Sequence, residues 1–361
     1  MPTKDGSGSS LALTQPLALS MGDPAGIGLE ITLRAWIERT RRGLAPFVIF
    51  ADPDAIAQRA HELGLVAPVE IITDLPSSAA VFHRALPVIC VPLAAPVKAG
   101  VADARNGHAT IASIEAAVAA VVKGEASALV TNPIAKSVLY EAGFTHPGHT
   151  EFLGALAARH QPGHRVTPVM LLACDDLKVV PLTIHIPLAA VPGALSKSLI
   201  IETVRTLSQA LASDFAIALP RIAVTGLNPH AGEAGTMGLE EREIIEPAIH
   251  SLVAEGLSVT GPHPADTLFH AAARKTYDAV VAMYHDQALI PVKTLAFDRG
   301  VNVTLGLPFV RTSPDHGTAF DIAAKGVASS ESLIQALLLA ANMAARRATS
   351  HSASGAGRPA P

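Results

Sequence analysis

Short apolar runs that alternate with segments of helical periodicity constrain the fold of this chain more than any other feature. In the first half, buried strands are predicted at 17–21, 46–51, 69–72, 87–91 and 128–131. Helices are predicted between and after them, at 29–39, 53–63, 108–123 and 134–142. Strands and helices that alternate in this way favour an α/β fold with a mainly parallel sheet.

The second half of the chain breaks this pattern at one point. The apolar runs 169–174 and 178–184 flank Asp175 and Asp176 and predict a β-hairpin, which would make the sheet mixed and mark a second domain. The chain has 361 residues, 49% of them hydrophobic, which is enough for a large core and two domains. Further strands are predicted at 221–225 and 279–283, and helices at 151–160, 192–213, 239–255, 265–274 and 331–347.

Composition excludes two classes of function. Charged residues make up only 16% of the chain, the formal net charge is −4, and no basic stretch is long enough for a nucleic-acid site. The uncharged segment 179–196 has the length of a membrane span, but three prolines and His185 interrupt it. Cys90 and Cys174 lie in separate apolar runs, so we expect buried thiols and a cytoplasmic location rather than a disulfide framework.

A candidate site begins where the strand-like run 279–283 ends. His285 and Asp286 follow directly, and ligands of open α/β sheets bind outside the carboxyl ends of strands. A solvated loop without a specific role is the alternative interpretation. The stretch 283–321 also supplies polar side chains that suit a small anionic ligand, namely Lys293, Asn302, Arg311, Asp315 and His316.

Two other histidines stand in the same context as His285. His185 and His230 also lie at or just past the end of an apolar, strand-like run. Three neutral imidazoles with an open coordination position suit a catalytic divalent metal such as zinc. A single histidine at a strand end is more often a core or rim residue. The spacing of the three histidines alone therefore does not show whether they bind a metal. Nearby polar residues could support such ligands as hydrogen-bond partners: Asn228, Glu233, Asp266 and Asp286.

The same residues suggest a division of chemical roles. A metal could polarise a substrate hydroxyl or carbonyl oxygen, while Lys293 stabilises or exchanges the proton and Asp286 relays it. Lys293 and Arg311 could instead clamp a phosphate or carboxylate, the arginine by two parallel hydrogen bonds. Lys293 could also be a solvated surface lysine. The sequence leaves these roles open.

A glycine-rich turn, Gly22–Gly28, connects the first predicted strand to the first predicted helix. A strand, a glycine turn and a helix N-terminus together can form an anion site. The turn is neither a GxGxxG fingerprint nor a Walker loop, so a simple tight turn is an equal alternative.

Beyond these inferences, the chain resembles the 4-hydroxythreonine-4-phosphate dehydrogenase family of pyridoxal phosphate biosynthesis. The resemblance covers about residues 17–326. It is carried by MGDPAGIGLEI (21–31), TNPIAK (131–136), GHTEFLG (148–154), GLNPHAGEAG (226–235), YHDQ (284–287) and LPFVRTSPDHGTAFDIA (307–323). One position departs from the pattern: Ala324 stands where the family and its relatives usually have glycine, in DIAAKG.

The resemblance implies a fold similar to isocitrate and isopropylmalate dehydrogenases, with two α/β/α domains and a cleft between them. We expect a discontinuous first domain of residues 16–145 plus 305–349 and a second domain of residues 146–304. The segments 1–15 and 350–361, rich in small and polar residues, are expected to be disordered tails. The resemblance also implies a homodimer whose active site draws on both subunits.

Residue roles follow from the same motifs. His185, His230 and His285 match the family's divalent-metal ligands, for zinc, magnesium or cobalt. The matched substrate contacts are His149, Thr150, Lys293, Asn302 and Arg311. The loop His316–Ala323 is similar to the adenosine-side NAD loop of decarboxylating dehydrogenases, which would explain the missing Rossmann fingerprint. The expected contacts to NAD, or to NADP, are Gly317, Thr318 and Asp321.

The implied reaction is oxidation of the C3 hydroxyl of 4-phosphohydroxy-L-threonine, with hydride transfer to NAD. The product, a β-keto acid, can lose carbon dioxide to give 3-amino-2-oxopropyl phosphate. Branches of the family act on D-threonate or D-erythronate 4-phosphate or on an aromatic dihydrodiol. Lys293, Asn302 and Arg311 favour a phosphorylated, carboxylated substrate over the aromatic one. A third possibility is a metabolite-binding protein on an inactive dehydrogenase fold.

Overall fold

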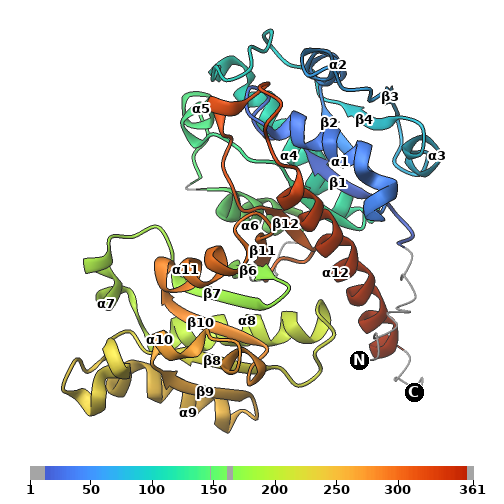
Figure 1. Ribbon diagram of the computed structural model, residues 1–361. Helices are drawn as coiled ribbons and strands as arrows, with labels where there is room; N and C mark the ends of the chain where they lie inside the picture. Colours follow the sequence, from blue (N-terminus) through green and yellow to red (C-terminus); the bar gives the residue numbers. More distant parts are fainter. Residues whose placement is uncertain (1–12, 147, 161–165, 356–361) are drawn as a thin grey trace, which may run out of the picture.

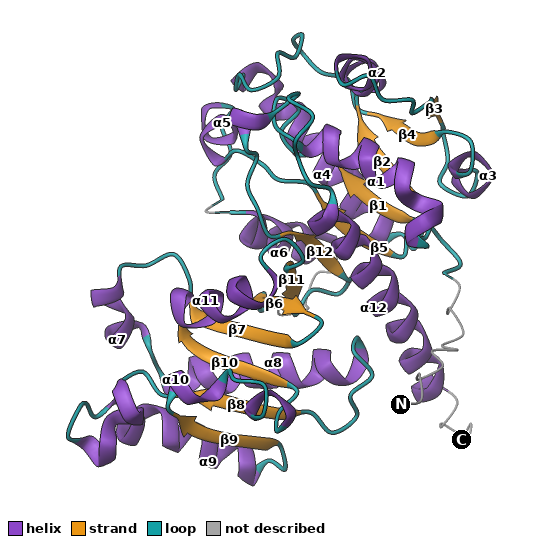
Figure 2. Cartoon of the chain, viewed as in Figure 1, coloured by secondary structure: helices purple, strands orange, loops and turns teal. Residues whose placement is uncertain are grey.

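A single mixed sheet of twelve strands organises the molecule, in the order β3-β4-β2-β1-β5-β12-β11-β6-β7-β10-β8-β9 (Figures 1 and 2). The computed structural model describes residues 13–146, 148–160 and 166–355. The first six strands along the chain are β1 (Leu17–Ser20), β2 (Phe47–Ala51), β3 (Val69–Ile71), β4 (Leu86–Cys90), β5 (Ala128–Thr131) and β6 (Val169–Cys174). The others are β7 (Leu177–Thr183), β8 (Arg221–Thr225), β9 (Ser258–His263), β10 (Ala279–Tyr284), β11 (Val301–Leu305) and β12 (Arg311–Pro314).

Parallel pairing dominates the two ends of the sheet, and antiparallel pairing joins them. At one end, neighbouring strands pair in parallel in the order β3-β4-β2-β1-β5-β12. At the other end, neighbours pair in parallel in the order β7-β10-β8-β9. Between these groups, β12 pairs with β11, β11 with β6, and β6 with β7, all antiparallel. The predicted α/β class, the mixed sheet and the hairpin are therefore confirmed. The boundaries of the two domains stay predictions.

Helices pack on both ends of this sheet (Figures 1 and 2). In the first half of the chain they are α1 (Gly28–Arg42), α2 (Pro53–Glu62), α3 (Ser78–Phe82), α4 (Gly107–Val122), α5 (Lys136–Glu141) and α6 (His149–His160). In the second half they are α7 (Val191–Ala194), α8 (Lys197–Ser213), α9 (Glu246–Ala254), α10 (Ala265–Leu268), α11 (His285–Ala296) and α12 (Glu331–Gly355).

Local signals in the sequence explain several helix ends. The Asp52 side chain accepts hydrogen bonds from the backbone N–H groups of Asp54 and Ala55, and Pro53 follows it at the first helical position of α2. Ser196 caps α8 by accepting from the Leu199 N–H. Gly43 ends α1 in the left-handed conformation, with φ at 63°.

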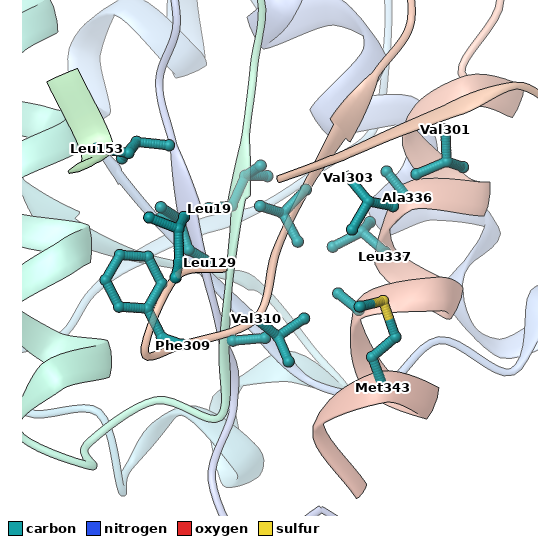
Figure 3. Close-up of a cluster of buried hydrophobic side chains, with 14 of the residues drawn as sticks. Leu19, Leu129, Leu153, Val301, Val303, Phe309, Val310, Ala336, Leu337 and Met343 are labelled. Carbon is teal, nitrogen blue, oxygen red and sulfur yellow. The ribbon is translucent and has the colours of Figure 1, made fainter. Parts of the chain in front are cut away.

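The central core lies where the two ends of the sheet meet. Side chains from β1, β5, β11 and α12 converge there, as Figure 3 shows for Leu19, Leu129, Val303 and Leu337. Each of these four is at most 1% exposed. Because α12 contacts strands and helices from both ends of the sheet, it helps to hold the two ends together.

Several details differ from the sequence predictions. The helix α11 and the strands β9, β11 and β12 were not predicted, and the predicted helix 265–274 is only the short α10 with a 3-10 turn at 273–275. The helix α12 runs to Gly355, so the predicted disordered tail overlaps its end, while residues 1–12 and 356–361 lie outside the described residues. Cys90 is exposed and Cys174 is half-buried, so the prediction that both thiols are buried is wrong for Cys90 and is met only in part for Cys174.

Candidate active site

A cavity of about 390 Å³ lies where β5, β11 and β12 meet. Six of the predicted site residues line it: His149, Thr150, His185, Asn302, Arg311 and Gly317. They come from α6, the segment after β7, the two central strands and the loop after β12. Asp315 and His316 of the predicted polar stretch also line the cavity. The lining residues to which the sequence analysis gave no role include Thr131, Asn132, Lys136 and Glu151. The fold thus brings residues together that are far apart in the chain.

Arg311 is the buried cation of this cavity. It is 3% exposed, and it donates to Thr304 Oγ1 at 3.0 Å and to Thr131 Oγ1 at 2.6 Å. Among the described residues, no carboxylate forms an ion pair with it. Burial lowers the pKa of Arg311 to about 10, so the guanidinium stays protonated near neutral pH. A buried arginine held only by neutral hydroxyls is well suited to an anionic ligand.

His149 faces the same cavity in its neutral form. Burial lowers its pKa well below the usual value, and the positive charges of Arg311 and Lys136 lower it further. The Nε2 atom of His149 is buried and has no partner among the described residues. A neutral imidazole with a free ring nitrogen can exchange a hydrogen bond with a ligand in the cavity.

Five more buried polar atoms of residues that line this cavity have no hydrogen-bond partner among the described residues; two of them are Asn132 Oδ1 and Asp315 Oδ2. The other three are Asn302 Oδ1, Arg311 Nε and His316 Nε2. Buried polar groups in proteins are nearly always hydrogen-bonded, so several unpaired atoms around one cavity indicate a place for a polar ligand. Burial also lowers the pKa of His316, whose Nδ1 lies 3.0 Å from the Gly317 carbonyl oxygen.

Lys293 is held by Asp315 at the edge of this cavity. Its Nζ donates to the Asp315 carbonyl oxygen at 2.9 Å and lies 2.5 Å from Oδ2 of the same residue. That Oδ2 atom accepts no hydrogen bond in this arrangement, so the contact is an ion pair. Lys293 is therefore neither a fully solvated surface lysine nor free in the cavity. Asp315 lines the cavity, so its ion pair connects Lys293 to the site.

His185 and His285 lie next to each other although 100 residues separate them in the sequence. Their ring centroids are 5.7 Å apart. Two imidazoles that bind one zinc ion at about 2 Å would place their centroids about 5–6 Å apart, so the pair fits two ligands of one ion. Asp286 Oδ1 lies 2.7 Å from Nδ1 of His285, the kind of partner that orients a ligating ring. Partial burial and then the charge of Lys136 lower the pKa of His185, which favours the neutral ring.

Among the described residues, the His230 ring makes no ring contact with this pair. It is exposed, on the turn η3 (Pro229–Gly235) that follows β8. Within the part of the chain that the structure describes, no group of three or more His, Cys, Asp or Glu side chains is arranged to hold a metal ion. The structure thus brings two of the three predicted metal ligands together in one chain. The predicted supporting residue Asn228 lies in the same segment as His230.

The predicted cofactor loop packs against the glycine-rich turn. Ile27 N–H donates to the Thr318 carbonyl oxygen at 3.0 Å, and a Cβ at Gly26 would lie only 2.8 Å from the same oxygen. Gly317 lines the cavity and has open space around it, whereas Asp321 is exposed on the 3-10 turn after it. The glycine turn therefore serves close packing against this loop.

The sequence did not reveal the roles of two charged residues that shape the cavity. Lys136 was only part of the matched motif TNPIAK, yet its charge lowers the pKa of both His149 and His185. The signal was available, because the motif follows a strand-like run that ends at Thr131, as the other site segments do. Asp315 was named as part of the polar stretch, but nothing in the sequence paired it with Lys293.

With this geometry in hand, comparisons with known proteins decide the family. The family described as pyridoxal phosphate biosynthetic protein PdxA matches residues 43–340 of the chain. The chain belongs to the PdxA family. The family resemblance that the motifs predicted is confirmed, and with it the assignment of the chain as an oxidoreductase enzyme.

Individual PdxA relatives are similar over nearly the whole chain. A 4-hydroxythreonine-4-phosphate dehydrogenase from Methylorubrum populi is 56% identical over 337 residues, which cover 92% of this chain and 96% of the relative. The enzyme of the same name from Xanthobacter autotrophicus is 53% identical over 330 residues, which cover 91% of this chain and 93% of that protein.

Solved structures agree with this PdxA assignment. The crystal structure of 4-hydroxythreonine-4-phosphate dehydrogenase from Klebsiella pneumoniae matches with a TM-score of 0.81 and 38% identity, over 92% of this chain and 99% of that chain. A terephthalate 1,2-cis-dihydrodiol dehydrogenase from Burkholderia xenovorans LB400 matches with a TM-score of 0.60 and 29% identity, over 91% of this chain and 98% of that chain. None of the helices that the structure describes has the length and apolar character needed to cross a bilayer.

Proposed function

We propose that this PdxA protein is an NAD- and divalent-metal-dependent dehydrogenase that oxidises 4-phosphohydroxy-L-threonine at its C3 hydroxyl. The observation that carries the proposal is the buried Arg311 guanidinium, which has no carboxylate partner among the described residues and faces the cavity. Such a group is well suited to bind an anion, and this substrate supplies both a phosphate and a carboxylate. NADP is the alternative cofactor.

The ligand set of the metal site is a proposal as well. We assign the ion, which is zinc, magnesium or cobalt, to His185, His230 and His285. Because one chain groups only the rings of His185 and His285, we propose that the site is completed in a homodimer, with at least one ligand from a second copy of the chain. When bound, the ion supplies Lewis-acid polarisation of the reacting C–O group, and NAD accepts the hydride.

The residues of the chain then have separate tasks. Arg311 and Asn302 bind and orient the anionic ends of the substrate, and His149 with Thr150 contacts its polar groups. Lys293, oriented by Asp315, is the candidate for exchanging the hydroxyl proton, and Asp286 orients His285. Loss of carbon dioxide from the resulting β-keto acid would give 3-amino-2-oxopropyl phosphate. Gly317, Thr318 and Asp321 are the proposed cofactor contacts.

The alternative substrates can be compared by the anionic groups that they offer to the cavity. D-threonate and D-erythronate 4-phosphate carry the same two anionic groups, so they are the alternative substrates. The aromatic dihydrodiol named in the Burkholderia xenovorans structure carries carboxylates but no phosphate. We disfavour it because that protein is 29% identical to this chain, whereas the 4-hydroxythreonine-4-phosphate dehydrogenases from Methylorubrum populi and Caulobacter vibrioides are 56% and 50% identical. We place the protein in the cytoplasm of the cell in which it makes this vitamin precursor.

The test is NADH formation by purified, metal-loaded protein. We expect turnover with 4-phosphohydroxy-L-threonine and little with unphosphorylated 4-hydroxy-L-threonine, the matched control for the phosphate. Preferred turnover of D-threonate or D-erythronate 4-phosphate would replace the proposed substrate and keep the reaction class. Binding of ligand without any NAD reduction would favour the inactive-fold alternative.

A further inference from the structure

The segment that carries His230 has an unusual backbone. Five successive residues, 230 to 234, have positive φ values between 40° and 76°, and only Gly232 among them is a glycine. Left-handed backbone costs about 1–2 kcal/mol for each residue that has a Cβ. Such a conformation persists only where the surrounding structure enforces it. Contacts around this turn must therefore hold it in place.

A buried carboxylate lies directly beneath the turn. Glu241, at the start of the π-helical turn Glu241–Ile245, is 1% exposed. Its Oε1 accepts hydrogen bonds from the backbone N–H groups of Leu227 and Asn228, both at 2.8 Å. Its Oε2 accepts from Asn228 Nδ2 at 3.0 Å. Among the described residues, no lysine or arginine pairs with Glu241, so these N–H donors solvate its charge.

The backbone closes tightly around this carboxylate. A Cβ at Gly232 would lie 2.5 Å from Glu241 Oε2, and a Cβ at Gly226 would lie 3.1 Å from Oε1. Gly232 is the middle residue of the left-handed run, so the run passes over the carboxylate with no room for a side chain. The carboxylate thus contacts both the start and the middle of the segment that presents His230.

The start of this segment, at Thr225 and Gly226, is also hydrogen-bonded to the helix that begins at His285. Gln287 Nε2 donates to the Gly226 carbonyl oxygen at 2.9 Å. Gln287 Oε1 accepts from Thr225 Oγ1 and from the Met283 N–H, both at 2.7 Å. Gln287 stands two residues after His285 at the start of α11. The segment of His230 is therefore fixed relative to the end of β10.

We propose that Glu241 is a positioning residue for the metal site, because its carboxylate fixes the left-handed turn that presents His230. This inference rests on the proposed role of His230 as a metal ligand. Glu241 acts through the backbone of residues 227–232 and touches neither substrate nor ion. Residues that orient a metal ligand typically change metal affinity about 10–100-fold when they are mutated.

The test is Co²⁺ binding by the purified full-length protein, followed by the visible absorption spectrum of the ion and by equilibrium dialysis. In Glu241→Gln, one carboxylate oxygen becomes an NH₂ group, which cannot accept from Asn228 Nδ2. We expect the affinity for Co²⁺ to fall about 10–100-fold and the spectrum to change, while circular dichroism stays that of the folded protein. Glu243→Gln, an exposed glutamate two residues away, is the matched control and should bind as wild type.

Wild-type affinity and spectrum in a folded Glu241→Gln variant would overturn the inference. The variant His230→Ala, measured in parallel, separates the two proposals. If His230→Ala loses Co²⁺ and Glu241→Gln does not, only the positioning role fails; if His230→Ala keeps Co²⁺, the proposed metal site itself fails. Should Glu241→Gln not fold, Asn228→Ala removes one of the three hydrogen bonds, and unchanged Co²⁺ binding in that variant would contradict the proposal.

Discussion

The Lys293 ammonium group lies 2.5 Å from the Asp315 carboxylate, and it also donates to the carbonyl oxygen of the same residue. The two residues come from α11 and from the segment that follows β12. Both side chains are largely shielded from solvent, at 29% and 13% exposed. Asp315 therefore fixes where the ammonium group stands relative to the cavity.

This relationship predicts that Asp315→Asn lowers kcat. Without the carboxylate, the lysine loses its ion pair and its fixed position, and we expect a loss of about tenfold or more in kcat, since small misplacements of a reacting group are costly. Steady-state kinetics with the proposed substrate measure the effect. Asp298→Asn, an exposed carboxylate near the end of α11, is the control. Equal kcat in both variants would show that the Lys293–Asp315 pair has no part in the reaction.

Arg311→Lys is expected to raise KM for the phosphorylated substrate. Lysine keeps the charge but loses the planar fork and at least one of the two hydrogen bonds to Thr131 and Thr304. Loss of one charge-assisted hydrogen bond to an anion, about 1.5–3 kcal/mol, corresponds to a KM increase of about tenfold or more. The control is the half-exposed Arg299→Lys. An unchanged KM would contradict the anion-binding role of Arg311.

His230→Ala should abolish metal retention and activity while the protein stays folded. The side chain is exposed, so its removal leaves no cavity in the core. Metal content after dialysis, activity with and without chelator, and circular dichroism are the measurements. Full turnover of this variant in the presence of chelator would contradict the assignment of His230 as a ligand.

The stability of the protein should fall in mild acid because of His149. Its folded pKa lies well below the usual value, so the unfolded chain binds the proton more readily than the folded chain does. Stability is therefore retained above the unfolded pKa of about 6.5 and lost as pH falls below it, by at most about 1.4 kcal/mol per pH unit for this group.

The variant His149→Gln, which cannot take up the proton, should show a smaller loss. Urea unfolding of the wild type and the variant at neutral and mildly acidic pH measures the difference. His250→Gln, an exposed histidine on α9, is the control. Equal acid sensitivity of the His149 variant and the wild type would show that this imidazole is not held neutral by folding.

Ala324→Gly is expected to stabilise the protein. Ala324 has φ of 57°, which explains why glycine is usual at this place in the family resemblance. Relief of the left-handed strain, about 1–2 kcal/mol, outweighs the entropy cost of glycine, about 0.5–1 kcal/mol, so a net gain of roughly 0.5–1 kcal/mol is expected. Urea unfolding measures it. Ala158→Gly, at an exposed position in the last turn of α6, should instead destabilise, by up to about 1 kcal/mol.

The sequence predicted the strands β1 to β8 and β10, with the hairpin, because their side chains are apolar and their ends are marked by turns; it missed the edge strand β9. It did not predict β11 and β12, and the reason is functional. These strands carry Asn302 and Arg311, whose polar side chains serve the cavity and interrupt the apolar pattern that a buried strand normally shows. The helix α11 was missed because Pro291 stands inside it.

The candidate site was predictable in part for a similar reason. Strand ends identified His185, His230 and His285, since the carboxyl ends of parallel strands are where ligands bind. The contact between His185 and His285 requires the pairing of β7 with β10, which the sequence does not specify. The partners of Lys293 and of the His230 turn, Asp315 and Glu241, depend on burial and on distances that only the fold determines.

The unbroken sheet has a mechanical consequence for the enzyme. Backbone hydrogen bonds continue from β3 to β9, so no flexible linker separates the two ends of the molecule. If the cavity widens to admit substrate, the movement has to be a change of twist shared by the antiparallel strands β12, β11, β6 and β7. Asn302 and Arg311 stand on two of these strands, so an anion bound between them would resist that twisting and stiffen the centre of the protein.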